Sequence, residues 1–427
     1  MPTPPPTAYK PGTQLVVGSH DAEIVKFIGE GGFAHVYTVK VTPPIPGHDL
    51  CCLKRVQVPN KAYLNILRAE VGAMQRLKGC SNVVQYIDSH AERMHQSDAQ
   101  GQYEVFLLME FCEGGGLIEF MNSRLRDMLR EHEILKIMYD ITLGLAHMHY
   151  LQPPLLHRDL KIENVLITGD GTFKLCDFGS VSPVLRPPKT PQEFKILDDD
   201  IQHHTTVQYR SPEMLDITQN HPIDEKSDIW ALGIFLYKLC FYTTPFEFQG
   251  QTYEQFKQLV LGGVFNIPQR PAYSERLKNM IRVLLQTDPR LRPNVYQVMQ
   301  EICSMRHVEC PLTDIYQIQR PVRPQPQVQP LQLPVQVSAV PGVAQASSQA
   351  PSQAPSQTVS QVSSSGSLAG LVPQMQLPNI SVSQVPNMGN MPNMPQVSQA
   401  SQVPSSGSTQ QIPSQYSLHA HYPAVLT

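Results

Sequence analysis

Residues 157–164 read His-Arg-Asp-Leu-Lys-Ile-Glu-Asn, and this stretch decides the fold. Two shorter motifs follow it, Asp-Phe-Gly at residues 177–179 and Tyr-Arg-Ser-Pro-Glu at residues 209–213. Taken singly, an aspartate such as Asp159 or Asp177 is often a loop residue that caps a turn. The combination is far more specific, because an unrelated fold has no reason to carry all three motifs in this order. Together they predict one catalytic site.

Each position in these motifs offers a chemical role, because phosphoryl transfer needs positioning and charge neutralisation more than covalent chemistry. Asp159 would accept the proton of a substrate hydroxyl group, and Lys161 would stabilise the transferring phosphoryl group. Asn164 and Asp177 would bind Mg²⁺, since amide and carboxylate oxygens suit a hard cation. Such groups need a closed cleft, where an opposite-charge contact near 4 Å is worth about 4 kcal/mol instead of about 1 kcal/mol in water.

Upstream, residues 29–36 read Gly-Glu-Gly-Gly-Phe-Ala-His-Val. Glycines would let this backbone approach the phosphates of ATP, although an ordinary glycine-rich hairpin is an equal alternative. Lys54 would hold the α- and β-phosphates if Glu70, on the helix that follows, fixes its position. Alone, Lys54 reads as an exposed strand lysine and Glu70 as a solvated helix residue, and only the downstream motifs favour the catalytic interpretation.

The pattern of apolar residues predicts an α+β fold, with a small β-rich N-terminal lobe before a larger helical C-terminal lobe. Strands are expected at 24–28, 35–41, 51–58 and 105–111, with a loop at 91–102. We expect three parts: a short N-terminal extension (1–20), a folded domain (21–310) and a Pro/Gln/Ser-rich disordered tail (311–427).

Composition limits the possible partners. No Asp, Glu, Lys or Arg follows Arg323, so all charged chemistry lies upstream. The formal net charge of −3 predicts no nucleic-acid partner. The eight cysteines form no Cys-x-x-Cys pair, which argues against zinc and against a disulfide framework. The most apolar segment, residues 229–242, is too short for a membrane span and predicts a buried helix, and no signal peptide is apparent. We therefore expect a cytoplasmic protein without membrane insertion.

Over residues 21–310 the sequence resembles the protein kinase superfamily, with every main motif present except the third glycine of the phosphate loop, where Ala34 stands. Lys161 and Thr206 resemble the Ser/Thr class. More narrowly, the sequence resembles the Numb-associated kinase family at residues 30–34, 121–122, 177–180 and 209–214. It resembles the fungal members of that family, the actin-regulating kinases, at residues 11–13 and 17–20.

The resemblance implies a bilobal protein kinase fold and a non-specific serine/threonine protein kinase (EC 2.7.11.1) that uses ATP and Mg²⁺. Its substrates would be proteins, with threonines of endocytic or actin-cytoskeleton adaptors as targets, at actin or endocytic patches of the cell cortex. Met109 would be the gatekeeper residue, and Glu110 and Cys112 would offer backbone groups to adenine. The full set of expected ATP contacts is Gly29, Glu30, Gly31, Gly32, Phe33, Ala34, Val36, Lys54, Met109, Glu110, Cys112, Asn164 and Asp177.

Regulation of the activity is expected to depend on the long segment from Asp177 to Glu213, between the Asp-Phe-Gly and Tyr-Arg-Ser-Pro-Glu motifs. In kinases, an arginine placed like Arg158 often pairs with a phosphorylated activation segment. Here the acidic run at 198–200 could neutralise Arg158 without phosphate, or it could be a solvated loop. We expect activity without an upstream kinase. Glu213 and Arg292 are expected to form a buried ion pair that ties the segment to the large lobe.

Two functions stay open, an active kinase and a catalytically inactive kinase-fold scaffold. Inactive relatives usually lack one of Lys54, Asp159, Asn164 and Asp177, and this sequence has all four. A third interpretation makes the tail an assembly element and the kinase incidental. The Pro-x-x-Pro at residues 321–324 could bind an SH3 domain, although a plain linker is the commoner fate of such a stretch.

Overall fold

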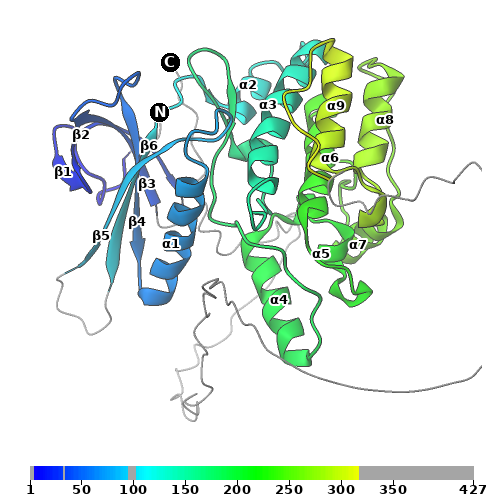
Figure 1. The fold of residues 1–427 in the computed structure, drawn as a ribbon, viewed down its shortest axis with the longest axis horizontal. Coiled ribbons are helices and arrows are strands. Elements are labelled where there is room, and N and C mark those ends of the chain that lie inside the picture. The colour runs from blue at the N-terminus through cyan, green and yellow to red at the C-terminus, as the bar shows by residue number, and fades with distance from the viewer. Residues whose placement is uncertain (1–3, 32–33, 95–101, 317–427) are drawn as a thin grey trace, which may run out of the picture. The chain divides into compact units, whose positions relative to one another are not determined.

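The computed structural model describes residues 4–31, 34–94 and 102–316. The predicted α+β, bilobal fold is confirmed, because the strands of the large sheet come first along the chain and most of the helices follow. Figure 1 shows this order as a change from blue and cyan strands to green and yellow helices. Nearly all of the predicted tail, from residue 317 onward, lies outside the described residues.

Six strands form an antiparallel sheet in the order β1-β2-β3-β4-β6-β5. Their bounds are β1 Gln14–Val17, β2 His20–Gly31, β3 Ala34–Thr42, β4 Cys51–Val58, β5 Tyr86–Arg93 and β6 Tyr103–Glu110. β4 occupies the predicted range, and the predicted strands at 24–28 and 35–41 fall within β2 and β3. β4 is almost entirely buried because it pairs on both sides.

The structure differs from the predicted strands at both edges of this sheet. Residues 91–93, expected in a loop, continue β5 and pair with β6. Glu92 and Arg93 can be charged here because β5 is the last strand of the sheet and its second half is exposed, a common property of edge strands. At the other edge, β1 lies within the expected extension of residues 1–20 and pairs with β2. The sheet therefore begins earlier in the chain than expected.

Helix α1 (Lys61–Arg76) packs on β4, β5 and β6 and carries Glu70. It begins at Asn60, whose side-chain oxygen accepts hydrogen bonds from the backbone N–H groups of Ala62 and Tyr63. Leu64, with its apolar neighbours three, seven and ten residues on, faces the sheet, so the predicted helical spacing holds. Packing of this face fixes the direction of Glu70, which is buried with the apolar residues.

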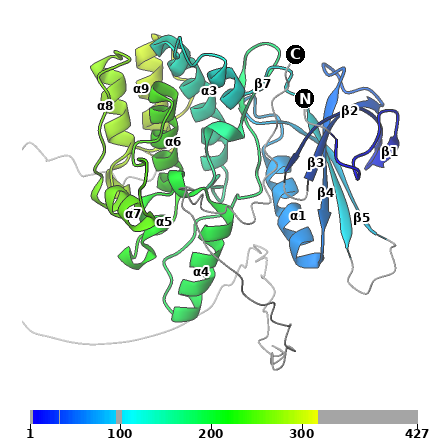
Figure 2. The same ribbon diagram turned by 180° about the vertical axis from the view of Figure 1, so that it is seen from behind.

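The C-terminal lobe is built around α6, which contacts α3 and α8 and is buried along nearly its whole length (Figure 2). Its helices are α2 Leu117–Asn122, α3 Glu131–His149, α4 Pro191–His204, α5 Pro212–Leu215, α6 Glu225–Phe241, α7 Tyr253–Gly262, α8 Glu275–Leu284 and α9 Val295–Arg306. A small sheet is formed by β7 Gly115–Gly116, β8 Val165–Ile167 and β9 Phe173–Leu175. The predicted buried helix at 229–242 is confirmed as part of α6, which ends at Phe241 and is capped by Tyr242 with φ 59°. Within the described ranges, no helix has both the length and the apolar character to cross a bilayer.

Candidate active site

The loop that carries Asp159 is held by a single buried carboxylate on α6. Asp228 accepts hydrogen bonds from the backbone N–H groups of His157 (2.9 Å) and Arg158 (2.8 Å). It also pairs with His149 of α3 at 2.9 Å. Burial raises the pKa of Asp228, but the hydrogen bond and charge of His149 outweigh burial and hold this pKa below its ordinary value. These bonds keep Arg158 in the left-handed region (φ 65°), which a non-glycine residue rarely adopts.

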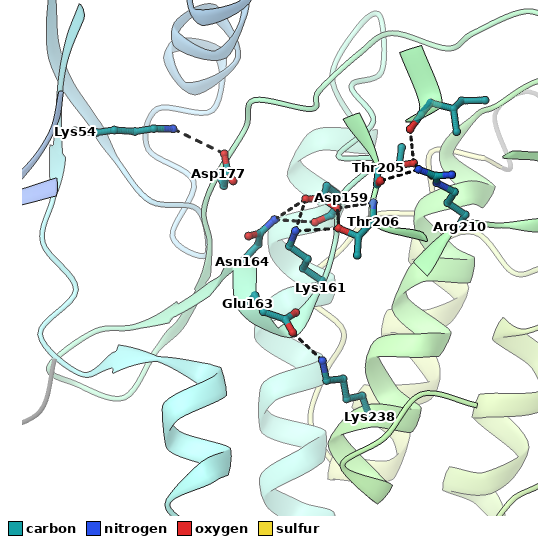
Figure 3. A network of polar contacts seen from close by, with 11 residues as sticks. Lys54, Asp159, Lys161, Glu163, Asn164, Asp177, Thr205, Thr206, Arg210 and Lys238 are labelled. Atoms are coloured by element: carbon teal, nitrogen blue, oxygen red, sulfur yellow. Dashed lines mark hydrogen bonds and ion pairs between the residues drawn. The ribbon is translucent and has the colours of Figure 1, made fainter. Parts of the chain in front are cut away.

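Asp159 lies at the centre of a closed hydrogen-bond network (Figure 3). Lys161 Nζ donates to Asp159 Oδ2 at 2.8 Å and to Thr206 Oγ1 at 2.9 Å. Thr206 Oγ1 in turn donates to Asp159 Oδ1 at 2.6 Å. Asp159 is 1% exposed, so these contacts act with little screening by water. The network holds a carboxylate ready to accept a proton beside a fixed positive charge.

Lys54 and Glu70 form a buried ion pair, with Lys54 Nζ 2.8 Å from Glu70 Oε1. The two residues are 6% and 4% exposed, so the interpretation of both as solvated is wrong. Lys54 Nζ is also 3.9 Å from Asp177 Oδ1 (Figure 3). Burial lowers the pKa of Lys54, but the charges of Glu70 and Asp177 outweigh burial and raise this pKa, so the lysine stays protonated. The arrangement presents a fixed cation to a phosphate chain.

Asn164 and Asp177, the expected metal ligands, fit a hard cation by their donor chemistry. Asn164 Nδ2 donates to the Asp159 carbonyl (2.9 Å) and Asp159 Oδ2 (3.2 Å), which engages the nitrogen of the amide and not its oxygen. Asp177 has a left-handed backbone (φ 62°) and a buried carboxylate. The described ranges contain no group of three or more His, Cys, Asp or Glu side chains that could hold a metal alone. This pair suits Mg²⁺, which usually takes few protein oxygens and completes its shell with phosphate and water.

The glycine-rich turn joins β2 and β3, with Gly29 opposite Val36, Glu30 opposite His35 and Gly31 opposite Ala34. The predicted contacts Gly32 and Phe33 lie outside the described residues. Ala34 is not among the described non-glycine residues with positive φ. A methyl group at this position therefore meets no backbone penalty, which explains why alanine can replace the third glycine.

A cavity between the two lobes is lined by Val36, Lys54, Glu70, Met74, Val84, Met109, Cys176 and Asp177. Met109 is a buried residue of β6, and its side chain lines the cavity. The next residue, Glu110, pairs its side chain with Lys174 and donates its backbone N–H to Gln85. A contact from Glu110 to adenine would therefore have to use its carbonyl oxygen. The roles of these residues and of Cys112 toward adenine stay predictions.

Cys176 is buried at the back of this cavity. Burial, reinforced by the charge of Asp177, raises the pKa of its thiol well above the ordinary value. A thiol that stays protonated is a poor nucleophile, so the structure supports the interpretation of Cys176 as a small buried apolar residue.

The activation segment contains a helix, α4, that the sequence did not predict. Thr190 caps it by accepting a hydrogen bond from the N–H of Glu193, and Pro191 follows at its first position. Ile201 of α4 packs in a small core with Leu156 and Met214. This contact places the acidic run at residues 198–200 on an ordered helix beside the catalytic loop.

Of the two interpretations of the acidic run, the structure favours charge neutralisation. Arg158 Nη1 forms an ion pair with Asp200 Oδ2, and Arg158 Nε donates to the carbonyl of Ser180 at 2.6 Å. Asp200 Oδ1 also lies 3.0 Å from Nδ1 of His204, one turn along α4. Asp199, by contrast, is exposed. A carboxylate of the chain thus occupies the position expected for an activating phosphate.

Replacing Asp200 by asparagine should lower kcat of the unphosphorylated enzyme by about tenfold or more, because the buried Arg158 loses its counter-charge. The matched control is Asp199→Asn, which removes the same charge from the exposed side of α4. Burial raises the pKa of Asp200, but His204 and Arg158 outweigh burial and hold this pKa at about 2. The pair therefore contributes fully above the ordinary aspartate pKa and is lost only as pH falls through about 2. Steady-state assays from pH 5 to 8 should show no acid loss from this group, and equal effects of the two variants would contradict the assignment.

The predicted ion pair between Glu213 and Arg292 is present and buried. Arg292 Nη1 and Nη2 donate to Glu213 Oε1 and Oε2, each at 2.7 Å. Arg292 also donates to the carbonyls of Gln286, Thr287 and Lys226. The pair fastens α5, at the end of the activation segment, to the loop before α9.

Sequence reasoning missed three residues of this region. Thr206 was used only as a class marker, although its place three residues before Tyr209 was a usable signal. Asp228 lies 71 residues after His157, and no local pattern links the two. Lys238 of α6 pairs with Glu163 at 2.8 Å, and the apolar run of residues 229–242 gives no sign of this contact.

The bilobal fold and the network around Asp159 are those of the protein kinase class. The family described as Protein kinase domain matches residues 22–303, and the chain belongs to the protein kinase family. The predicted resemblance to the fungal actin-regulating Ser/Thr kinases, members of the Numb-associated group, is confirmed by the relatives below.

The chain is 56% identical over 315 residues to Actin-regulating kinase 1 of Saccharomyces cerevisiae, covering 73% of this chain and 48% of the relative. It is 54% identical over 318 residues to Actin-regulating kinase PRK1 of the same yeast, covering 74% and 38%. It is 48% identical over 305 residues to Serine/threonine-protein kinase ppk30 of Schizosaccharomyces pombe, covering 71% and 31%. The chain thus spans less than half the length of these relatives.

Proposed function

We propose that this kinase transfers the γ-phosphate of ATP to threonine hydroxyls of endocytic or actin-cytoskeleton adaptor proteins, as a serine/threonine protein kinase of class EC 2.7.11.1. The observation that carries the activity is the network of Asp159 with Lys161, Thr206 and Asn164. The adaptor substrates rest on the relatives, two of which are named actin-regulating kinases. All four residues usually altered in inactive kinases are present here, which favours an enzyme over the scaffold alternative.

The residues around Asp159 divide the work. Asp159 Oδ1 is within hydrogen-bond distance of the Thr206 hydroxyl, so the same carboxylate can accept the proton of an acceptor hydroxyl placed beside it. Lys161, already directed at Asp159, can donate to the transferring group as negative charge develops on it. Lys54, fixed by Glu70, can hold the α- and β-phosphates. Mg²⁺ held by Asn164 and Asp177 would supply charge neutralisation on the phosphate oxygens.

Activity should not require phosphorylation of the activation segment, because Asp200 already neutralises Arg158. A phosphatase-treated preparation of the chain should phosphorylate a library of threonine peptides with Mg-ATP at no less than about half the rate of the untreated sample. Mass spectrometry of the segment containing Thr190, Thr205 and Thr206 serves as the control that phosphate has been removed. Loss of all turnover after treatment would refute autonomous activity.

Domain limits, partners of the tail and a cellular location are also proposed for this chain. The kinase domain would extend over 21–310, and the Pro/Gln/Ser-rich tail over 311–427 would act as a tether, with SH3 domains as candidate partners of residues 321–324. The enzyme would work in the cytoplasm, at actin or endocytic patches of the cell cortex. Its relatives' names support the cytoskeletal part of this proposal.

A further inference from the structure

We propose that Lys238 sets substrate specificity, by neutralising Glu163 beside the acceptor site so that a basic residue near the target threonine gives no advantage. This inference rests on the proposed kinase function. It names a specificity residue on α6, outside the motifs that predicted the site. Its subject is the charge that a bound peptide meets next to Asp159.

Glu163 lies in the same loop as the catalytic network, two residues after Lys161, in the short 3-10 helix η1 (Ile162–Asn164). Figure 3 shows Glu163 next to Lys161 and Asn164 of the Asp159 network, with Lys238 reaching Glu163 from the far side. An extended peptide advances about 3.3–3.6 Å per residue. When the acceptor hydroxyl of the peptide reaches Asp159, the peptide residues on either side of the acceptor therefore lie near Glu163.

Lys238 Nζ donates to Glu163 Oε1 at 2.8 Å, and the side chains are 18% and 28% exposed. A pair with this exposure remains open to a ligand but is shielded enough to retain its attraction. The second oxygen, Glu163 Oε2, is buried and has no hydrogen-bond partner in the described part of the chain. Without Lys238, Glu163 would present an uncompensated negative charge to the peptide.

The groups packed around this pair leave Lys238 as its neutralising cation. Tyr209 lies beside it, with its ring centroid 5.7 Å from Lys238 Nζ. Burial and the charge of Glu163 raise the pKa of Tyr209 well above its ordinary value, so the ring stays neutral. Two other carboxylates act on Tyr209: Asp159, which is held in its own network, and Glu247, which is engaged by the hydroxyl of Thr244. Lys161 is the cationic residue nearest to Glu163 in the sequence, and its ammonium group donates to Asp159 and Thr206 instead.

The test compares peptides that contain one threonine and differ by a single arginine-for-alanine exchange at each of three positions before and after it. The measured quantity is the ratio of kcat/KM for the arginine peptide to kcat/KM for the alanine peptide. For the wild-type chain this ratio should stay within about twofold of one at every position. For Lys238→Glu it should rise about tenfold at one position or more and fall with added salt, because the attraction is screened. Lys238→Gln should give a smaller rise at the same position.

Two further variants separate specificity from structure. The double exchange Glu163→Lys with Lys238→Glu rebuilds the pair in reverse and should return the ratio to near one. Lys61→Glu, an equal charge change on the exposed start of α1, should leave the ratio unaltered. If Lys238→Gln slows both peptides equally, or if the wild type already prefers arginine, Lys238 is a structural tie and the inference is wrong. If the wild type phosphorylates no peptide, the proposed function fails instead.

Discussion

Asp177→Asn should reduce phosphoryl transfer by roughly a thousandfold or more, the largest effect expected of any single change in this chain. The exchange keeps the size of the side chain but removes its charge, which serves two purposes. It is the carboxylate expected to bind the metal, and at 3.9 Å it balances Lys54. The loss should appear in kcat with Mg-ATP, measured on the best library peptide.

The control for Asp177→Asn is Asp49→Asn, a matched exchange at an exposed loop position of the N-terminal lobe, which should retain full activity. Thermal unfolding of both variants shows whether the fold is kept. A folded Asp177→Asn enzyme with a tenth or more of wild-type turnover would remove Asp177 from the mechanism. If the wild-type chain itself shows no turnover above this variant, the scaffold alternative gains.

Arg292→Ala should destabilise the fold by about 3–5 kcal/mol, because it leaves Glu213 as a buried carboxylate without its partner. The side chains of Arg292 and Glu213 are 0% and 1% exposed, so water cannot replace the lost contact. Arg292 also bonds three backbone carbonyls, which would lose their donor. Urea unfolding followed by tryptophan fluorescence measures this loss, because the ring of Trp230 lies 5.1 Å from the Arg292 guanidinium.

Arg290→Ala is the matched control for Arg292→Ala, since Arg290 pairs with Asp288 at the surface and should leave the unfolding midpoint almost unchanged. Burial raises the pKa of Glu213, but Arg292 outweighs burial and lowers this pKa. The pair is therefore fully stabilising above the ordinary glutamate pKa and is lost as pH falls through the lower folded value. Equal midpoints for the two variants at neutral pH would show that Arg292 is not a structural anchor.

The parts of this fold that could be predicted depend on local signals. β4 follows from a run of eight residues of which five are apolar, and the spacing within residues 157–164 already places Lys161 and Asn164 beside Asp159. The misses have a common physical cause, since each depends on what a residue meets in space. Residues 91–93 form a strand although two of the three are charged, because they pair with β6. Asp228 fixes the catalytic loop across the distance from α6, and no pattern in the sequence announces that contact.

Helix α4 is a second case in which a contact in space, and not the sequence pattern, decides the role of a residue. The acidic run at residues 198–200 predicts either a counter-charge for Arg158 or a solvated loop, and charge alone does not decide between the two. The decision comes from Ile201, whose apolar contacts orient α4 so that Asp200 faces the arginine. One buried side chain thus separates two interpretations that composition leaves equal.

The ion pair between Asp200 and Arg158 has a consequence for how a cell could govern this enzyme. The carboxylate of Asp200 is part of the amino-acid sequence. A phosphatase therefore cannot remove it, and an upstream kinase would not be needed to add a negative charge. Under the proposed autonomous activity, catalytic output would depend on how many copies of the enzyme are made, where they lie in the cell and which substrates they meet there. A cell would then control this activity through the synthesis, degradation and location of the enzyme, and not through phosphorylation of its activation segment.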